Sequence, residues 1–135
     1  MEPYDTVRRY AELWAANDIT GLLAAYHEDF VLHYFGTSPL AGDHVGKDAA
    51  IRVLLEATQR SGRLLDEIED VLTGATFGAI VARESVGRDG ETRLVRRVLV
   101  YTVSNGKLRE CWLYDEDQRA IDELWSAPSP TPSQH

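Results

Sequence analysis

The strongest constraint on the fold lies between residues 77 and 114, where three strand-like segments follow one another with only short turns between them. Residues 77–86 and 92–103 are rich in β-branched and aromatic side chains, and an Asp-Gly pair within residues 88–91 joins them. An Asn-Gly pair within residues 104–107 forms a second turn before the segment 108–114. Such tight connections join antiparallel neighbours, so the sequence predicts an antiparallel β-meander.

A short strand, a turn-rich loop and the start of a helix are predicted over residues 29–51. Residues 30–35 are apolar and aromatic with one histidine among them, which is the composition of a buried strand. The loop that follows contains five turn-forming residues: Gly36, Ser38, Pro39, Gly42 and Gly46. From Gly46 onward a helix is expected, whose apolar face has the spacing i, i+3, i+4, i+7 at Ile51, Leu54, Leu55 and Thr58.

Two further helices are predicted before this segment. Residues 3–17 form an amphipathic pattern, and Asp18 or Thr20 would cap a second short helix that runs through Tyr26. The buried face of the first helix is expected to consist of Val7, Tyr10, Ala11 and Trp14.

The remaining segments complete an α+β domain. Residues 63–73 fit a helical and a strand period equally well, and propensity alone favours a helix. Residues 115–125 are expected to form a polar turn and a short helix. Residues 126–135 are rich in proline and serine and are predicted to be disordered. One domain over residues 1–125 is therefore expected.

Composition and charge argue against several classes of function. The formal charge of −8 disfavours binding to nucleic acid or to anionic membranes, because phosphate groups require a basic surface. Cys111 is the single cysteine, and the four histidines form no His-x-His or His-x-x-x-His pair, so no metal site is predicted. No apolar run approaches the roughly 20 residues that cross a membrane, and no signal-peptide pattern is present. A cytoplasmic location without a cofactor is expected.

Three stretches in a fixed order carry a family likeness: VRRYAELWAANDITGLLAAYHEDFVLHYFG, SPLAGDHVGKDAAI and VYTVSNGKLRECWLYDEDQRAIDELW. Together they resemble the SnoaL-like branch of the nuclear transport factor two-like superfamily, which includes ketosteroid isomerase, limonene epoxide hydrolase and polyketide cyclases. The resemblance implies a cystatin-like cone: a curved antiparallel sheet wrapped around helices, with an internal pocket. It also implies that residues 63–73 form a strand. This fold hosts many activities, so the likeness alone does not specify one.

Known catalytic positions of the superfamily transfer to this chain only in part. Tyr10 corresponds to the oxyanion-hole tyrosine of ketosteroid isomerase, but that enzyme's two catalytic aspartates correspond to Tyr34 and Leu99. The steroid-isomerase mechanism is therefore not expected. The Arg-x-Asp pair of the epoxide hydrolase corresponds approximately to Arg83 and Ser85, and its other aspartate corresponds to Asp115 or the adjacent Glu116.

Strand alternation, placed in the register that the resemblance implies, sorts the meander into two faces. The inward face is expected to comprise Arg97, Leu99, Tyr101, Cys111, Leu113 and Asp115. The outer face would then comprise Arg96, Val98, Val100, Thr102, Glu110, Trp112 and Tyr114. Because this outer face is too apolar to remain in water, we predict a homodimer through the sheet.

The preferred hypothesis is a cofactor-free acid–base enzyme (isomerase, cyclase, dehydratase or hydrolase) that acts on a hydrophobic, carbonyl-bearing substrate. Tyr10 would donate a hydrogen bond to the carbonyl, and His33 or Asp115 would transfer protons. His33 and Tyr34 are neighbours on a strand and must face opposite ways; the register favours Tyr34 in the pocket, and a bulge would admit His33. The expected substrate-binding residues are Trp14, Tyr34, Arg83, Arg97, Leu99, Tyr101 and Leu113.

Structural roles for the same residues remain open alternatives. Tyr10 and His33 would then be satisfied core residues, and Arg83 and Arg97 would form structural ion pairs with Asp115 and Glu116. The second hypothesis is a non-catalytic module that binds a small apolar ligand or dimerises, with a cone plugged by Trp14, Tyr26, Phe30 and Phe35. A protein-binding adaptor is the third.

Overall fold

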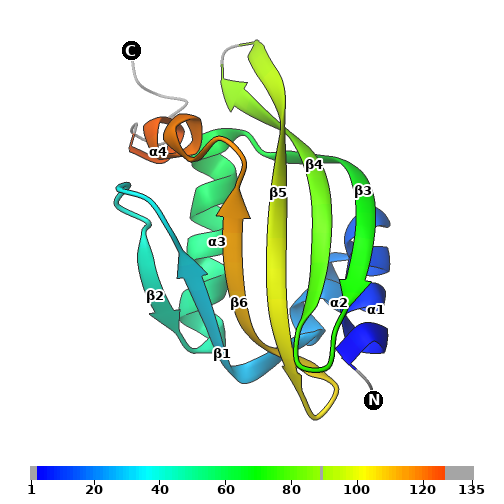
Figure 1. Cartoon of the computed structure of the whole chain (residues 1–135). Helices are drawn as coiled ribbons and strands as arrows, with labels where there is room; N and C mark the ends of the chain where they lie inside the picture. Colours follow the sequence, from blue (N-terminus) through cyan, green and yellow to red (C-terminus); the bar gives the residue numbers. More distant parts are fainter. Residues whose placement is uncertain (1–2, 89, 127–135) are drawn as a thin grey trace.

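The computed structural model describes residues 3–88 and 90–126, which form an α+β fold (Figure 1). In chain order the elements are α1 (Pro3–Ala15), α2 (Ile19–Ala24), β1 (Tyr26–Tyr34), β2 (Gly42–Val45), α3 (Lys47–Ser61), β3 (Leu64–Thr73), β4 (Gly78–Arg88), β5 (Glu91–Ser104), β6 (Lys107–Asp115) and α4 (Gln118–Ser126). The predicted tail lies outside the described residues, apart from Ser126, which ends α4.

The six strands form one curved sheet in the order β2-β1-β6-β5-β4-β3. The predicted meander is confirmed, because β4, β5 and β6 pair antiparallel through the two expected turns. The curved sheet is antiparallel as expected except for one pair of neighbours, because β1 and β6 run parallel. These strands are far apart in the chain, and the long connection between them allows the parallel orientation.

The helices α1, α2 and α3 lie on one face of the sheet, with α1 behind β3 and β4 and α3 behind β1 and β6 (Figure 1). The predicted face of α1 is confirmed: Val7, Tyr10 and Ala11 are buried, and Trp14 packs at the edge of the core. On α3 the predicted face is wrong in part, since Leu55 is 60% exposed and the fully buried residues are Ala50, Ala57 and Ser61. Small side chains on this stripe let the helix lie close to the sheet.

The segment 63–73 forms a strand over residues 64–73, as the resemblance implied, although local propensity favours a helix. The segment pairs with β4 from Leu64 to Thr73, with two irregularities in the register. The hydrogen-bonding edge that β4 offers therefore outweighs a propensity difference of a few tenths of a kcal/mol per residue. The turn-rich loop also contains a strand that the sequence did not indicate, because β2 pairs with β1 between residues 42 and 45.

The last helix closes the end of the cone. Ile121 and Trp125 of α4 are fully buried, and the Trp125 ring lies 4.5 Å from the Tyr34 ring, centroid to centroid. Of the side chains expected to plug the cone in the non-catalytic hypothesis, Phe30 is in the core, whereas Phe35 stacks on Tyr114 on the outer side of the sheet. Trp125 therefore closes this end, and the interior beside α1 stays open.

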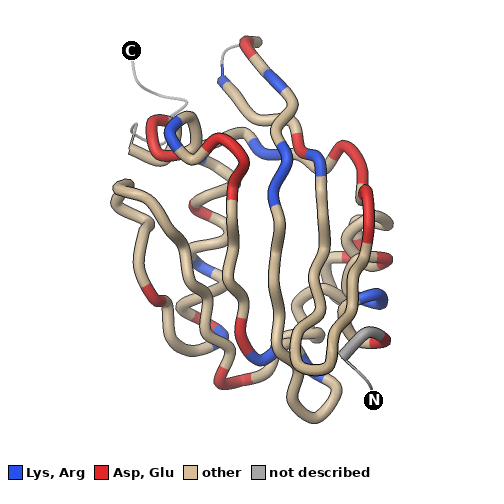
Figure 2. The backbone as a smooth tube through the Cα atoms, viewed as in Figure 1, with Lys and Arg blue, Asp and Glu red and all other residues tan. Residues whose placement is uncertain are grey.

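The predicted alternation of β5 and β6 is confirmed. Arg97, Leu99 and Tyr101 are buried, as are Cys111 and Leu113, while the residues between them are half-buried or exposed. Charged residues of β4 and β5 lie in the halves of these strands nearer their hairpin, and the remaining residues 78–82 and 98–104 carry none (Figure 2).

Candidate functional site

A cavity of ≈ 640 Å³ lies between α1, α2, the end of α3 and the inner face of β3, β4 and β5. Its walls are largely apolar and aromatic, and charged side chains are grouped toward β3, β4 and β5. The aromatic and charged side chains that line it include Tyr10, Trp14, Tyr26, Arg63, Glu84 and Arg97. A cavity of this size holds a small organic molecule.

Two tyrosines from different elements form a hydrogen-bonded pair in this cavity. Tyr10 of α1 and Tyr26 of β1 meet through their hydroxyl oxygens, and both side chains are buried. Burial raises the pKa of Tyr10 to about 12, although the hydrogen bond with Tyr26 acts in the opposite direction. Burial also raises the pKa of Tyr26 well above its ordinary value. Both phenols are therefore neutral, and since their mutual bond uses only one of their two protons, the other can be donated to a ligand.

Four charged side chains form a buried cluster beside the phenols, which we call the charge tetrad: Arg63, Glu84, Arg97 and Asp115. Arg63 Nη1 donates to Glu84 Oε1 at 2.8 Å, and Arg97 Nη1 lies 3.1 Å from the same oxygen. Asp115 Oδ1 accepts from Arg63 at 3.3 Å and lies 3.7 Å from Arg97 Nε. The four side chains are between 1% and 6% exposed.

Several donors of the tetrad remain without acceptors. Arg63 Nε, Arg97 Nε and Arg97 Nη2 are buried and have no hydrogen-bond partner among the described residues. These nitrogens are closed to solvent, and Arg97 also interacts with the side chain of Tyr34, so the two guanidinium groups act on the cavity through their charge. Although burial acts to lower the pKa of Arg97, the carboxylates of Glu84 and Asp115 raise it above its ordinary value, so this arginine stays charged.

The tetrad follows from four different local structures. Gly62 ends α3 in the left-handed conformation at φ 61°, which turns the chain so that Arg63 enters the interior. Glu84 is on the inward side of β4, in line with Ile80, Ala82 and Val86. Arg97 and Asp115 are directly paired residues of β5 and β6 and therefore project to the same face.

The structure brings four of the predicted site residues to the cavity: Tyr10, Trp14, Arg97 and Leu99. Asp115 is behind them, joined to the cavity through the two arginines. Tyr34, Tyr101 and Leu113 point inward as predicted, but they are packed in the core and do not line the cavity. Burial raises the pKa of Tyr34, with the positive charge of Arg97 acting against it.

The placement of His33 and Arg83 in the cavity is wrong. His33 is on the outer face of the sheet, stacked on Trp112 at 5.1 Å between ring centroids and bonded to Asp43 and Glu110. Arg83 is also on the outer face, 36% exposed, where it pairs with Asp66 and Glu67. Strand alternation explains both corrections, because Tyr34 and Glu84, their chain neighbours, occupy the inward positions.

Sequence reasoning missed Arg63, Glu84 and the role of Tyr26. The segment from Ala79 to Val86 is mostly apolar on both faces, so alternation alone did not show which of Arg83 and Glu84 turns inward. The glycine before Arg63 is a helix-end signal that could have placed this arginine at the mouth of the cone. The expected pairing of Arg97 with Glu116 is wrong as well, since Glu116 contacts Arg96 on the outer face.

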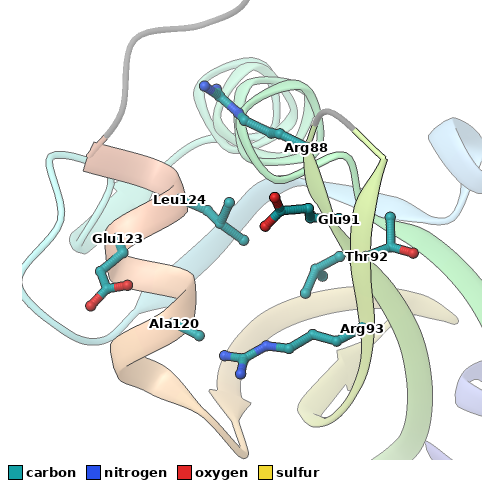
Figure 3. A pocket seen from close by; sticks show the side chains of 9 residues that line it. Arg88, Glu91, Thr92, Arg93, Ala120, Glu123 and Leu124 are labelled. Atoms are coloured by element: carbon teal, nitrogen blue, oxygen red, sulfur yellow. The ribbon is translucent and has the colours of Figure 1, made fainter.

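A second cavity, also of ≈ 640 Å³, lies between the β4–β5 hairpin and α4 (Figure 3). Glu91, Arg93 and Leu124 point into it, whereas Arg88 turns toward α3 and donates from Nε to the carbonyl of Arg60. Arg93 is engaged by Asp117 at 2.7 Å. The charged residues of this second cavity are of both signs and lie at the surface. The cavity with the phenol pair and the tetrad is therefore the better candidate.

Among residues 3–88 and 90–126, no three His, Cys, Asp or Glu side chains are grouped to hold a metal ion. Within the same residues, no helix is long and apolar enough to cross a membrane.

A sequence model of the SnoaL-like domain family matches residues 7–111, which is most of the chain. No curated protein matches this sequence. Among solved structures, a protein of unknown function with a cystatin-like fold from Xanthomonas campestris superposes with a TM-score of 0.83 at 22% identity, over 94% of this chain and 100% of the other.

Two further structures share the fold. Bal32a, from a soil-derived mobile gene cassette, has a TM-score of 0.73 at 25% identity, with 90% of this chain and 94% of the other covered. A candidate SnoaL-like polyketide cyclase from Jannaschia sp. CCS1 has a TM-score of 0.70 at 19% identity, with 92% and 91% covered. These likenesses confirm the cone-shaped α+β fold.

Proposed function

This chain belongs to the SnoaL-like domain family, and from the geometry of its cavity we propose that it is a cofactor-free acid–base enzyme that acts on a hydrophobic small molecule bearing a carbonyl group. The observation that carries the proposal is the convergence of a neutral phenol pair and a buried charge tetrad on one apolar cavity of ≈ 640 Å³. A cone filled by side chains, which is the dimerisation version of the non-catalytic hypothesis, would not leave such a space.

The reaction step that fits this geometry is enolisation. The C–H bond next to the carbonyl breaks, its proton passes to a carboxylate, and its electron pair moves onto the carbonyl oxygen to form an enolate. The spare proton of the Tyr10–Tyr26 pair would donate a hydrogen bond to that oxygen, and this bond strengthens as negative charge develops. Isomerisation, cyclisation or dehydration can each proceed from an enolate.

Glu84 is the carboxylate that we assign to the proton transfer, since it lines the cavity, whereas Asp115 does not. Its short contacts to Arg63 and Arg97 fall on Oε1, which leaves Oε2 to take up a proton. Asp115, which the sequence pointed to for this role, would act by holding the two arginines in place. The guanidinium groups would stabilise the oxyanion of the substrate electrostatically.

The proposal is tested by hydrogen–deuterium exchange next to a carbonyl, which requires no knowledge of the natural substrate. β-Tetralone in deuterated buffer, followed by NMR, should exchange its acidic protons faster with the protein than without it. Tyr10→Phe and Glu84→Gln should each reduce this acceleration about 10²-fold or more. Arg83→Gln, on the outer face, is the matched control and should keep the wild-type rate.

Each other outcome has a defined meaning. Acceleration that survives in both variants would remove Tyr10 and Glu84 from the mechanism. Binding of β-tetralone without acceleration would favour the non-catalytic ligand-binding alternative. A protein that binds no aromatic carbonyl compound at all would contradict the proposed function.

A further inference from the structure

The charge tetrad has an equal number of positive and negative groups: Arg63 and Arg97 against Glu84 and Asp115. All four side chains are almost completely buried, so solvent does little to screen them. Each arginine of the tetrad forms an ion pair with both carboxylates. The charged end of the cavity is therefore electrically neutral before any ligand enters.

A ligand that carries its own charge would disturb this balance. A carboxylate beside the tetrad would raise the number of negative groups above the number of positive ones, and an uncompensated buried charge is strongly unfavourable. The opening of the cavity adds to this effect for anions, because Asp66 and Glu67 line it and carry negative charge. Their partner Arg83 contacts them from the outer face of the sheet.

A neutral carbonyl compound meets no such penalty. Its oxygen can accept a hydrogen bond from the spare phenol proton without changing the net charge of the cavity. Enolisation also leaves the combined charge of the tetrad and the ligand unchanged, because the proton that leaves the ligand stays in the cavity on Glu84 while the ligand becomes negative. The cavity is thus neutral before and after the proposed proton transfer.

We infer that this cavity selects uncharged carbonyl compounds, such as ketones and esters, over carboxylic acids of the same shape, and that the neutral sum of the charge tetrad sets this selection. The inference rests on the proposed small-molecule function of the cavity and specifies its substrate class.

The test compares the affinities of four probes of similar shape by titration calorimetry: acetylnaphthalene, methyl naphthoate, naphthoate and naphthylmethylammonium. The wild-type protein should bind the ketone and the ester at least about tenfold more tightly than either charged probe. The cation is included because an acidic rim alone would reject the anion and attract the cation. Equal or tighter binding of either charged probe would overturn the inference.

Variants that change the charge sum provide the second part of the test. Glu84→Gln makes the sum positive and should shift the ratio of naphthoate to ketone affinity at least about tenfold toward naphthoate. The double variant Arg63→Gln with Glu84→Gln returns the sum to zero and should restore the wild-type preference. Glu69→Gln is the matched control: it changes the total charge equally, but Glu69 does not line the cavity and pairs with Arg96 on the outer face. An unchanged ratio in a folded Glu84→Gln protein, as judged by circular dichroism, would overturn the inference.

Failure of the inference and failure of the proposed function are distinguishable. If the charged probes bind as well as the neutral ones, the cavity remains a binding site and only the charge selection is wrong. If no probe binds, the proposed function itself is wrong, and the inference with it. If either charge variant fails to fold, the comparison of the four probes in the wild-type protein still decides the inference.

Discussion

His33 joins three strands on the outer face of the sheet. Its Nδ1 lies 2.6 Å from Asp43 Oδ1 on β2, and its Nε2 lies 2.5 Å from Glu110 Oε2 on β6. Only the protonated ring can donate from both nitrogens at once. Burial acts to lower the pKa of His33, but the hydrogen bonds with Asp43 and Glu110 outweigh it and raise the pKa above 6.5. A histidine considered for catalysis is thus a structural cation.

This arrangement predicts a pH-dependent contribution to stability. Because the folded-state pKa is raised, the extra stability is fully present below the unfolded pKa of 6.5 and is lost as the pH rises through the folded-state pKa. Urea denaturation should show the wild type to be more stable than His33→Gln by on the order of 1 kcal/mol at about pH 6, with a smaller difference at about pH 9.

Two measurements check the cause of this effect. The pKa of His33, followed by NMR, should be lower in Asp43→Asn than in the wild type, because one of the two acceptor carboxylates is gone. A stability difference between wild type and His33→Gln that does not change with pH would show that the imidazolium contributes nothing.

At the scale of elements, the junction between α3 and β3 decides where Arg63 points. Gly62 has φ 61°, and a side chain at this position would place its Cβ 2.4 Å from the carbonyl oxygen of Gly87 in β4. Glycine is required here for two reasons: the left-handed backbone and the close approach of a neighbouring strand. The charge tetrad therefore depends on a residue that has no side chain.

Gly62→Ala should lower the free energy of unfolding by about 3 kcal/mol or more, since both left-handed strain and a backbone clash oppose it. Gly106→Ala is the matched control: its φ is 72°, but no atom lies within 4 Å of an added Cβ. The control should lose only about 1 kcal/mol. Equal losses in urea denaturation would show that the contact with Gly87 relaxes freely. The Gly62 variant should also bind acetylnaphthalene less tightly.

For the molecule as a whole, the outer face of the sheet is not covered by any helix among residues 3–88 and 90–126. Trp112, Val98 and Val100 are half-buried there, and Phe77 and Tyr114 are each 47% exposed. The Phe77 ring lies 5.7 Å from the Trp112 ring, so these aromatic side chains form a continuous surface. An apolar face of this kind marks an interface, and we propose that a second copy of the chain covers it.

Sedimentation at micromolar concentration should therefore show a dimer. Val100 lies between Ala79 of β4 and Trp112 of β6, in the middle of the sheet. Val100→Lys should weaken dimerisation about 100-fold or more, because the charge would be buried at the centre of the interface. Leu55→Lys, at an exposed position of α3, removes a comparable apolar side chain and should leave the dimer intact. A monomeric wild-type protein would contradict this assembly.

Local patterns in the sequence were sufficient for most of the elements. Glycine-containing turns between β-branched segments determine the meander, and the spacing of Val7, Tyr10 and Ala11 determines the buried face of α1. These predictions hold because they depend on neighbours within a few residues along the chain. The strand β2 was missed for the opposite reason: its few residues form a strand only because β1 offers them a hydrogen-bonding edge.

In the site, too, some residues were predictable from local patterns and others depend on tertiary contacts. That Tyr10, Arg97 and Leu99 share the interior could be predicted before the structure, from helical spacing for Tyr10 and from alternation in the register implied by the family resemblance for Arg97 and Leu99. The folded chain turns Glu84 rather than Arg83 toward the cavity and brings Arg63 beside it, which no local pattern predicted. It also closes the end of the cone with Trp125. The physical reason is that a buried charge is tolerated only beside an opposite charge, and the residues that neutralise one another here come from four segments that only the folded sheet brings together.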